Sequence, residues 1–364
     1  MDAPVDGGQF PARRGAGGPG NARTPDPAAR EIVRAWRALT GGRGVRDADR
    51  RTLVACSGGA DSTALVLCLV AAAREHVVVG HVVHDLRAPD EAEADATAVA
   101  SLCDRLGVAL ALARIEVRGT PGNAESAARR ARYRALSRLA QGHGCGVVAT
   151  GHQGDDLLET MLMRLVRGAG VGALAGMAAS RPLESLRLVR PMLGVTRADA
   201  ERVCRAGGVR WRDDATNQDA TRWRARLRRD VVPVLRDLRK DVHRRASDSA
   251  TMLRAAAALV EREARIVLAG ASRGPGRVQW TREALGDLGP AVLSEIVRLG
   301  RHEVAGEPGA DRLHARTVAR IVAGLRAPDR RAREWTCGGV RIRADRQSVR
   351  IDALGTEGGG SIGI

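Results

Sequence analysis

The stretch from Thr52 to Arg74 limits the fold of this chain more than any other, because an apolar run, a glycine-rich turn and a second apolar run follow one another in it without a break. The first run, Thr52–Cys56, has the length and the β-branched content of a short buried strand. The second, Ser62–Arg74, is rich in Ala and Leu and is long enough for a buried helix. The five residues between them, SGGAD, allow only a tight turn. The sequence therefore predicts a strand that leads directly into the start of a helix.

Strand and helix patterns go on alternating beyond this unit. We expect strands at 52–56, 76–85, 108–115 and 146–150, and helices at 31–39, 62–74, 90–106, 123–143 and 155–167. This alternation is typical of an α/β fold, in which a parallel sheet has helices on both faces. Ligands bind such sheets beyond the carboxyl ends of the strands. Ser57, His84 and His152 each follow an expected strand, so we expect them at one edge of the sheet.

The character of the chain changes near Asp219. Residues 221–245 hold ten basic and three acidic side chains. Helical patterns then reach to 268 and recur at 290–304 and 313–325, and strand patterns lie at 277–280, 335–337, 339–343 and 348–351. These patterns predict a second, smaller helical or α+β domain. We expect a disordered Gly-, Pro- and Ala-rich tail over 1–28, the main domain over 29–219, a basic linker helix and the small domain over 220–355, and a frayed end over 356–364.

The composition narrows the classes of function. Lys and Arg number 59 against 42 Asp and Glu, and the resulting net charge of +17 attracts polyanions such as nucleic acid. A GC-rich coding sequence would also enrich arginine, so the charge leaves nucleic-acid binding open. The six cysteines form no C-x-x-C pair, which argues against a zinc ribbon, an iron–sulfur site and a disulfide scaffold. Since no apolar run approaches the roughly 20 residues of a membrane span, we expect a cytoplasmic protein without a membrane partner.

The turn SGGADS has the properties of a phosphate site. Glycines let backbone N–H groups approach an anion, and the start of the following helix adds partial positive charge. No lysine follows, so this is not the common P-loop, and the spacing is not that of a dinucleotide fingerprint. A carboxylate at Asp61 would repel phosphate unless a cation lay between them, which favours magnesium pyrophosphate with Asp61 on the metal. The alternative is a plain turn in which Asp61 and Ser62 only cap the helix.

The same six residues, Ser57, Gly58, Gly59, Ala60, Asp61 and Ser62, resemble the pyrophosphate loop (PP-loop) of the N-type ATP pyrophosphatases, enzymes with an adenine nucleotide alpha hydrolase-like fold. These enzymes release pyrophosphate from ATP and leave an adenylated substrate. Within that superfamily, the chain over about 51–234 resembles the short form of the tRNA(Ile)-lysidine synthetases. The resemblance rests on HVVHDLR (81–87), NAESAARRARYRAL (123–136), VATGHQGDDLLETMLMRLVRGAGVGALAGM (148–177), VRPMLGVTRADAE (189–201) and WRDDATNQD (211–219).

The resemblance implies a ligase that forms a carbon–nitrogen bond. Such an enzyme uses ATP and Mg2+ to join free L-lysine to C2 of the first anticodon cytidine of a CAU-anticodon tRNA(Ile), through an adenylated base, and releases AMP and pyrophosphate. The small domain would then bind tRNA, and a homodimer is compatible with the sequence. Two other functions stay open. One is thiolation of a tRNA cytidine by a related enzyme, a chemistry that generally uses paired cysteines. The other is RNA binding without catalysis, against which the intact loop argues.

His152, Asp156 and Glu159 are the candidate residues of a second motif. Their spacing places them on one face of a helix that begins there. A histidine with two carboxylates is a possible metal site, but acidic residues at a helix start also complement its dipole without any catalytic role. The resemblance implies that all three lie near Mg·ATP, lysine and the reacting base. Asp156 and Glu159 are both candidates for the base that takes a proton from lysine.

Basic residues supply the remaining candidates. Arg129 and Arg132 belong either to a solvated helix face or, as the resemblance implies, to a site for phosphate or the target nucleotide. His84 ends the second strand, where the resemblance places the nucleotide. Arg224, Arg226 and Arg228 are expected to contact tRNA phosphates. Between them Ala225 stands where the family usually has an asparagine, so any hydrogen bond of that amide is lost.

Overall fold

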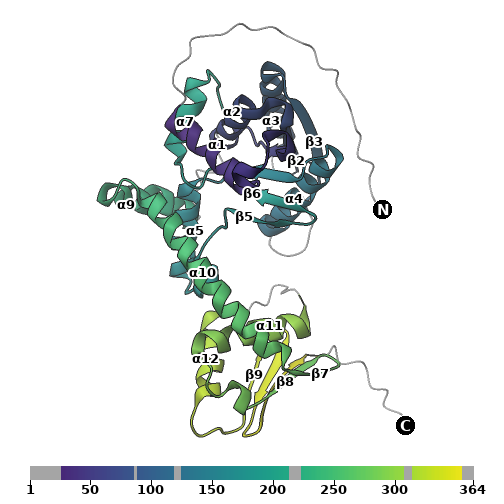
Figure 1. Cartoon of the computed structure of the whole chain (residues 1–364), viewed down its shortest axis with the longest axis vertical. Coiled ribbons are helices and arrows are strands. Elements are labelled where there is room, and N and C mark those ends of the chain that lie inside the picture. Colours follow the sequence, from purple (N-terminus) through teal and green to yellow (C-terminus); the bar gives the residue numbers. More distant parts are fainter. Residues whose placement is uncertain (1–25, 86–87, 119–123, 213–222, 307–313, 355–364) are drawn as a thin grey trace, which may run out of the picture. The chain divides into compact units, whose positions relative to one another are not determined.

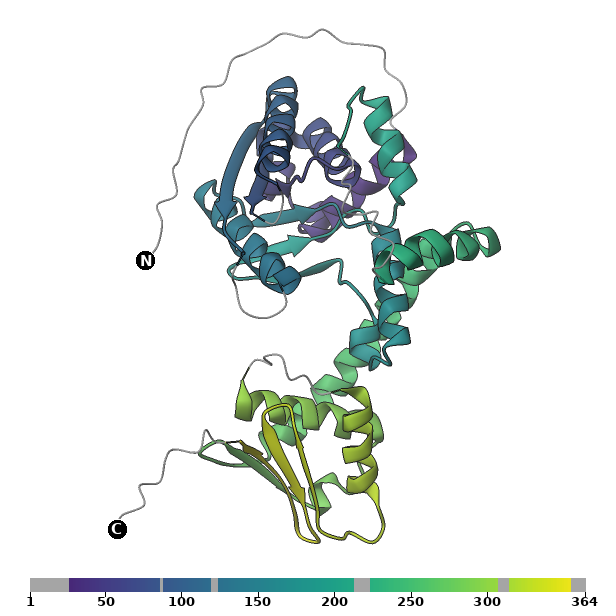
Figure 2. The ribbon, with the colours of Figure 1, turned by 180° about the vertical axis from the view of Figure 1, so that it is seen from behind.

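Two compact units make up the chain. The computed structural model describes residues 26–85, 88–118, 124–212, 223–306 and 314–354. The first unit consists of residues 1–163 and 176–250, and the second of 164–175 and 251–364 (Figures 1 and 2). The tail and the end that we expected to be disordered lie outside the described residues, except for residues 26–28. Asp26 accepts a hydrogen bond from the backbone N–H of Ala28 and so caps the first helix.

The first unit is built on a six-stranded sheet with the order β3-β2-β1-β4-β6-β5. All strands run parallel except β5, which pairs antiparallel with β6 at one edge. This confirms the predicted α/β fold. The strands are β1 (Thr52–Ala55), β2 (Val77–His84), β3 (Ala109–Ile115), β4 (Val147–Thr150), β5 (Ser180–Leu183) and β6 (Leu186–Val189), and the helices are α1 (Pro27–Leu39), α2 (Ala60–Ala73), α3 (Pro89–Leu106), α4 (Ala124–Gly142), α5 (Gly154–Val166), α7 (Arg197–Ala206), α8 (Trp223–Arg226) and α9 (Val232–Leu238).

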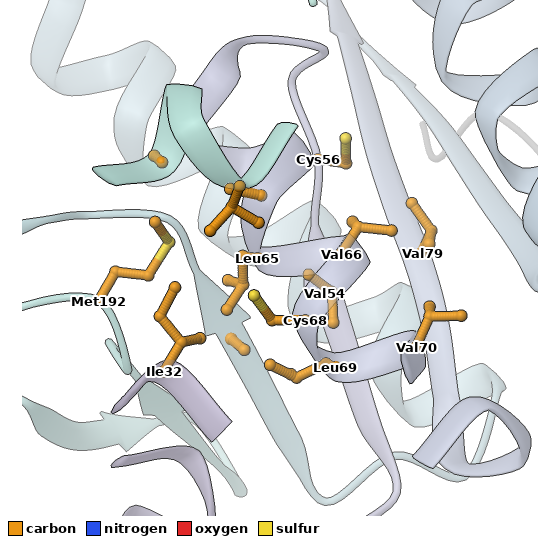
Figure 3. Close-up of a cluster of buried hydrophobic side chains, with 14 of the residues drawn as sticks. Ile32, Val54, Cys56, Leu65, Val66, Cys68, Leu69, Val70, Val79 and Met192 are labelled. Carbon is orange, nitrogen blue, oxygen red and sulfur yellow. The ribbon is translucent and has the colours of Figure 1, made fainter. Parts of the chain in front are cut away.

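Alternate residues of the central strands pack into two separate cores. Val54 and Val79 face a core formed with α1, α2, α3 and α7, which contains Leu65 and Met192 (Figure 3). Their neighbours in the chain point to the opposite face of the sheet and pack with α4 in a second core. Because both faces are covered, the strands are apolar almost throughout, which is why their sequence pattern was clear. Short helical turns complete the unit at η1 (Gly42–Gly44), η2 (Asp47–Arg50), η3 (Arg74–His76) and η5 (Leu227–Val231).

The hairpin of β5 and β6 and the helix α7 were not among the expected elements. Each strand of the hairpin has four residues, and Pro182 and Arg187 interrupt its apolar pattern. Helix α7 is short but well capped, because the Thr196 hydroxyl accepts from the Asp199 N–H and the Asp199 carboxylate accepts from the Thr196 N–H. Through β6, the hairpin adds a parallel partner to β4.

The second unit contains an antiparallel sheet with the order β7-β8-β11-β10-β9. One face of the sheet packs its apolar residues against three helices, whereas arginines and acids alternate on the other. This agrees with the predicted second domain of mixed type. Its elements are α6 (Val171–Leu174), the second half of the long helix α10 (Val242–Ala269), β7 (Ser272–Gly274), β8 (Arg277–Thr281), η6 (Glu283–Leu285), α11 (Pro290–Ala305), α12 (Ala315–Arg326), β9 (Arg333–Cys337), β10 (Val340–Ala344) and β11 (Ser348–Ala353). Among the described helices, none combines the length and apolar character that a membrane crossing requires.

Candidate functional site

The order of strands reverses between β1 and β4. After β1 the chain adds β2 and β3 on one side, and it then returns to place β4 on the other. A sheet of this kind binds ligands at such a switch point, here beyond the carboxyl ends of β1 and β4. The glycine loop follows β1, and the segment from Gly151 to Asp156 follows β4. The two predicted motifs therefore meet at the position where this type of sheet binds ligands.

Hydrogen bonds within the glycine loop fix its shape. Gly58 has a positive φ of 86°, which a residue with a side chain rarely adopts. The Ser62 hydroxyl accepts from the Ser57 N–H (3.1 Å) and donates to the Gly59 carbonyl (3.0 Å). Helix α2 then begins at Ala60, and its first N–H groups have no carbonyl partner within the helix. The loop thus presents backbone donors and a helix N-terminus toward an anion.

Gly151 lets β4 approach this loop closely. A Cβ atom at this position would lie 2.9 Å from the backbone nitrogen of Ser62 and 3.0 Å from its Cα. Both atoms belong to the first turn of α2 and cannot move aside as a flexible side chain could. The absence of a side chain at Gly151 is therefore a condition for bringing the two motifs together.

The Asp61 side chain is half-buried, and one of its oxygens lacks a hydrogen-bond partner. Its Oδ1 atom has no hydrogen-bond partner, and its Oδ2 atom lies 3.6 Å from Nη1 of Arg197. Burial, and after it the negative charge of Asp156, raises the pKa of Asp61 to about 7. A carboxylate oxygen in this position fits a bound cation, which would supply the missing partner. In the described parts of the chain no three His, Cys, Asp or Glu side chains are grouped to hold a metal by themselves. Mg2+ commonly needs only one or two carboxylates beside substrate phosphates and water.

Asp156 and Glu159 form an ion cluster with two arginines. Glu159 is fully buried, and it accepts from Nε of Arg228 (2.7 Å) and from Nε of Arg224 (2.8 Å). Asp156 accepts from Nη2 of Arg224 (2.7 Å), while its other oxygen accepts from the Gln153 N–H (3.1 Å). Asp156 therefore both caps α5 and belongs to the cluster. Burial raises the pKa of Asp156.

The basic candidates are thus divided between two environments. Arg224 and Arg228 face acids within the first unit, whereas Arg226 is exposed to solvent. Of the three, Arg226 is the one whose guanidinium has no ion pair in the described structure. The expected phosphate contacts of all three arginines remain predictions, and the ion cluster gives Arg224 and Arg228 a second role that the basic character of the segment did not reveal.

His152 lies two residues before α5, so it does not share the helical face of Asp156 and Glu159 as the spacing suggested. Its Nδ1 atom is 2.9 Å from the Thr150 hydroxyl. Burial lowers the pKa of His152 to about 3, and the nearby charge of Arg190 contributes. The imidazole is therefore neutral at pH 7.

The other basic candidates lie at the same edge of the sheet. His84 Nε2 is 3.2 Å from Nη2 of Arg132, and Arg129 donates to the Tyr133 hydroxyl (3.2 Å). The first contact connects the end of β2 with helix α4, and the second lies within α4. The expectation that the residues after β1, β2 and β4 share one edge agrees with this arrangement.

Comparisons with known proteins identify the family. Residues 30–235 match the family model described as a PP-loop domain. The chain is 35% identical to the tRNA(Ile)-lysidine synthase of Salinispora tropica over 83% of its own length and 90% of that protein. It is 38% identical to that of a Methylobacterium species, over 84% and 82% of the two chains. The chain belongs to the tRNA(Ile)-lysidine synthase family.

Members of the tRNA(Ile)-lysidine synthase family are ligases, and the PP-loop domain implies ATP binding. A solved structure also resembles this chain, the U34-tRNA thiolase NcsA of Methanococcus maripaludis with its 4Fe–4S cluster. The TM-score is 0.52 at 15% identity, covering 62% of this chain and 78% of the thiolase chain. At this identity the similarity supports the shared fold alone.

Several residues at the site were not predicted within this family resemblance. His81 contacts the residue before the glycine loop, since its Nδ1 atom is 2.7 Å from the Cys56 carbonyl oxygen. Arg212 donates its N–H to the Gly58 carbonyl (3.0 Å) and pairs with Asp95 (2.6 Å). Both positions lie inside stretches that carry the resemblance, HVVHDLR and WRDDATNQD, and that membership was the available signal. Arg197, which contacts Asp61, also lies in a stretch that carries the resemblance, VRPMLGVTRADAE.

Proposed function

We propose that this protein joins free L-lysine to C2 of the first anticodon cytidine of tRNA(Ile) with a CAU anticodon, using ATP. The observation that carries the proposal is the 35% to 38% identity to tRNA(Ile)-lysidine synthases over more than four fifths of the chain. The positions of the two motifs after the neighbouring strands β1 and β4 are consistent with it.

Two displacements make up the reaction. In the first, the C2 oxygen of the cytidine attacks the α-phosphorus of ATP, and the bond to pyrophosphate breaks. In the second, the lysine ε-nitrogen attacks C2, and AMP leaves with the oxygen that it had bound. The first step is needed because the base carbonyl oxygen is otherwise a poor leaving group.

The glycine loop is suited to hold the leaving pyrophosphate. Backbone donors of the loop and the N-terminus of α2 would carry part of the negative charge. Asp61, with its unpartnered Oδ1, would hold Mg2+ beside the phosphates. Bound Mg2+ would neutralise phosphate charge, which a carboxylate alone would repel.

Lysine must lose a proton before it attacks. With an ordinary pKa near 10.4, less than about 0.1% of the amine is neutral at pH 7. Asp156 is better placed than Glu159 to accept this proton. Its pKa is raised by burial, and its side chain keeps some exposure (14%), whereas the Glu159 side chain is fully buried. We assign Asp156 as the base and Glu159 as the residue that positions the arginines around it.

Thiolation of a tRNA base is the second candidate function, favoured only by the thiolase of similar fold. The cysteines do not support it. Five of the six are buried, and burial raises the pKa of Cys68, Cys103 and Cys204 to about 12. A thiol that stays protonated is a poor nucleophile for sulfur transfer.

Incorporation of labelled lysine into tRNA transcripts tests the proposal. Transcripts with a CAU anticodon should take up lysine when ATP and Mg2+ are present, and transcripts with uridine as the first anticodon base should not. The Asp156→Asn variant serves as the inactive control, with tRNA affinity within a few-fold of the unmodified protein. Incorporation of sulfur in place of lysine would refute the assignment. Light scattering on the same purified protein would test the predicted homodimer. Fractionation of cells would test the predicted cytoplasmic location.

A further inference from the structure

Four arginines are buried in the described structure, and one of them differs from the others. Arg50, Arg282 and Arg301 each place their guanidinium on two or more backbone carbonyls. Arg190 is 4% exposed and donates Nη1 to the Ala178 carbonyl (2.6 Å). Its Nε–H is buried without a hydrogen-bond partner, and whereas the Nε of Arg50 also has none but lies 3.1 Å from the Asp47 carboxylate, Arg190 has no carboxylate at this distance among the described residues. A buried charged donor without a partner is costly, which indicates that its partner is a ligand.

Further positive charge surrounds Arg190. The Tyr133 hydroxyl acts on Arg190 by raising the pKa of its guanidinium. Two other guanidiniums lie over the Tyr133 ring, those of Arg129 at 5.2 Å and Arg181 at 4.9 Å from the ring centre. Among the side chains that the structure describes, no carboxylate pairs with these three arginines. Burial lowers the pKa of Arg190, and the charges of Arg181 and Arg129 lower it further.

We propose that Arg190, together with Arg129, Arg181 and Tyr133, forms a second phosphate subsite, separate from the glycine loop. The inference rests on the proposed function for the identity of its substrates. Forked guanidinium donors match phosphate oxygens, and an anion would supply both the partner of Nε and the missing negative charge. The positive charges of Arg190 and Arg129 also lower the pKa of His152.

Two phosphates of the reaction have the required chemistry. One is the α-phosphate that passes from ATP to the base and leaves as AMP, away from the pyrophosphate on the glycine loop. The other is the backbone phosphate next to the target cytidine. The α-phosphate is the better match, because it must be held after its bond to pyrophosphate has broken, when the loop retains only the leaving group.

Calorimetric titration with AMP tests whether Arg190 binds the α-phosphate. Saturating Mg2+ and pyrophosphate occupy the glycine loop, so added AMP reports on the second subsite. Arg190→Met should weaken AMP binding about tenfold or more, the expected effect of losing a charge-assisted contact. Arg138→Met, which removes an exposed charge from α4, should change AMP binding less than twofold. If Arg190→Met does not fold, Arg190→Lys keeps the charge without the fork and should still weaken binding.

A second titration uses an anticodon stem-loop RNA at several salt concentrations. Unchanged AMP binding with a salt slope reduced by about one unit would assign the subsite to a backbone phosphate. If neither AMP binding nor the slope changes in Arg190→Met, the subsite does not exist. Neither readout requires lysine transfer. The proposed subsite can therefore be refuted while lysine incorporation by the unmodified protein succeeds, and the subsite can be confirmed while lysine incorporation fails. Ligand-free Arg190→Met should also unfold at or above the temperature of the unmodified protein, whereas Arg301→Met should unfold below it.

Discussion

Removing Arg228 should destabilise the first unit through Glu159. The variant Arg228→Ala leaves a fully buried carboxylate with Arg224 as its remaining ionic partner. Arg228 makes two charge-assisted hydrogen bonds to Glu159, at 2.7 and 3.0 Å, and such bonds contribute about 1.5–3 kcal/mol each. The Arg228 side chain is 35% exposed, so solvent screens part of this energy. We expect a coupling of about 1–3 kcal/mol between the two side chains.

A double-mutant cycle measures this coupling. Urea unfolding at pH 7 gives the free energies of the unmodified protein, Arg228→Ala, Glu159→Gln and the double variant. The double variant should be less destabilised than the sum of the single variants, because the buried charge disappears together with its partner. Arg226→Ala is the matched control on the same segment. It should keep the stability within about 0.5 kcal/mol and reduce the salt slope of tRNA binding by about one unit. A coupling near zero would refute the stabilising role of the ion cluster. The predicted contact with tRNA phosphates would then be the only role left for Arg228.

Three further outcomes are expected. Asp61→Asn should keep the fold and lose most ATP–pyrophosphate exchange measured with tRNA and Mg2+, and normal turnover with an unchanged Mg2+ requirement would contradict the assignment. Gly151→Ala should cost about 1–3 kcal/mol in urea unfolding and also lower exchange, because its Cβ would press on the backbone of Ser62; a variant as stable as the parent would show that the loop yields. His152 should titrate near pH 3 by NMR, since its pKa is lowered to about 3, so the rate profile between pH 6 and 9 should carry no step from it; a chemical-shift transition of this imidazole near pH 6 would disprove that.

The strands β1 to β4 of the first sheet could be predicted because each is a short apolar run that ends at glycine or a polar residue. Covering both faces of the sheet removes the polar alternation that makes edge strands ambiguous. The four-residue strands β5 and β6 lacked that signal, and Pro182 obscured it further. The strand β1, the glycine loop and the helix α2 could be predicted as well, since the change from a strand pattern to a helix pattern is visible in the residues themselves.

The partners of the arginines could not be predicted in the same way. Arg224 and Arg228 belong to a basic segment, and charge alone does not tell a carboxylate partner from a phosphate. Arg190 stands in LRLVRPML, where nothing in the sequence indicates that this arginine is buried or that its Nε–H lacks a hydrogen-bond partner. These distinctions depend on contacts between residues far apart in the chain.

The central position of β1 has a consequence for how the chain folds. Pairing of β1 with β2 joins Thr52 to Val77 and requires only a modest loop, whereas pairing with β4 joins Thr52 to Val147, about 95 positions away. The entropy of closing a loop grows with its length, and contacts between distant residues form slowly. We therefore expect the β1–β4 pairing to form after β1, β2 and β3 have associated. Since the two motifs follow those two strands, a chain that has not yet reached this step would already contain its glycine loop but could not yet bring it together with Gly151 and the acids of α5.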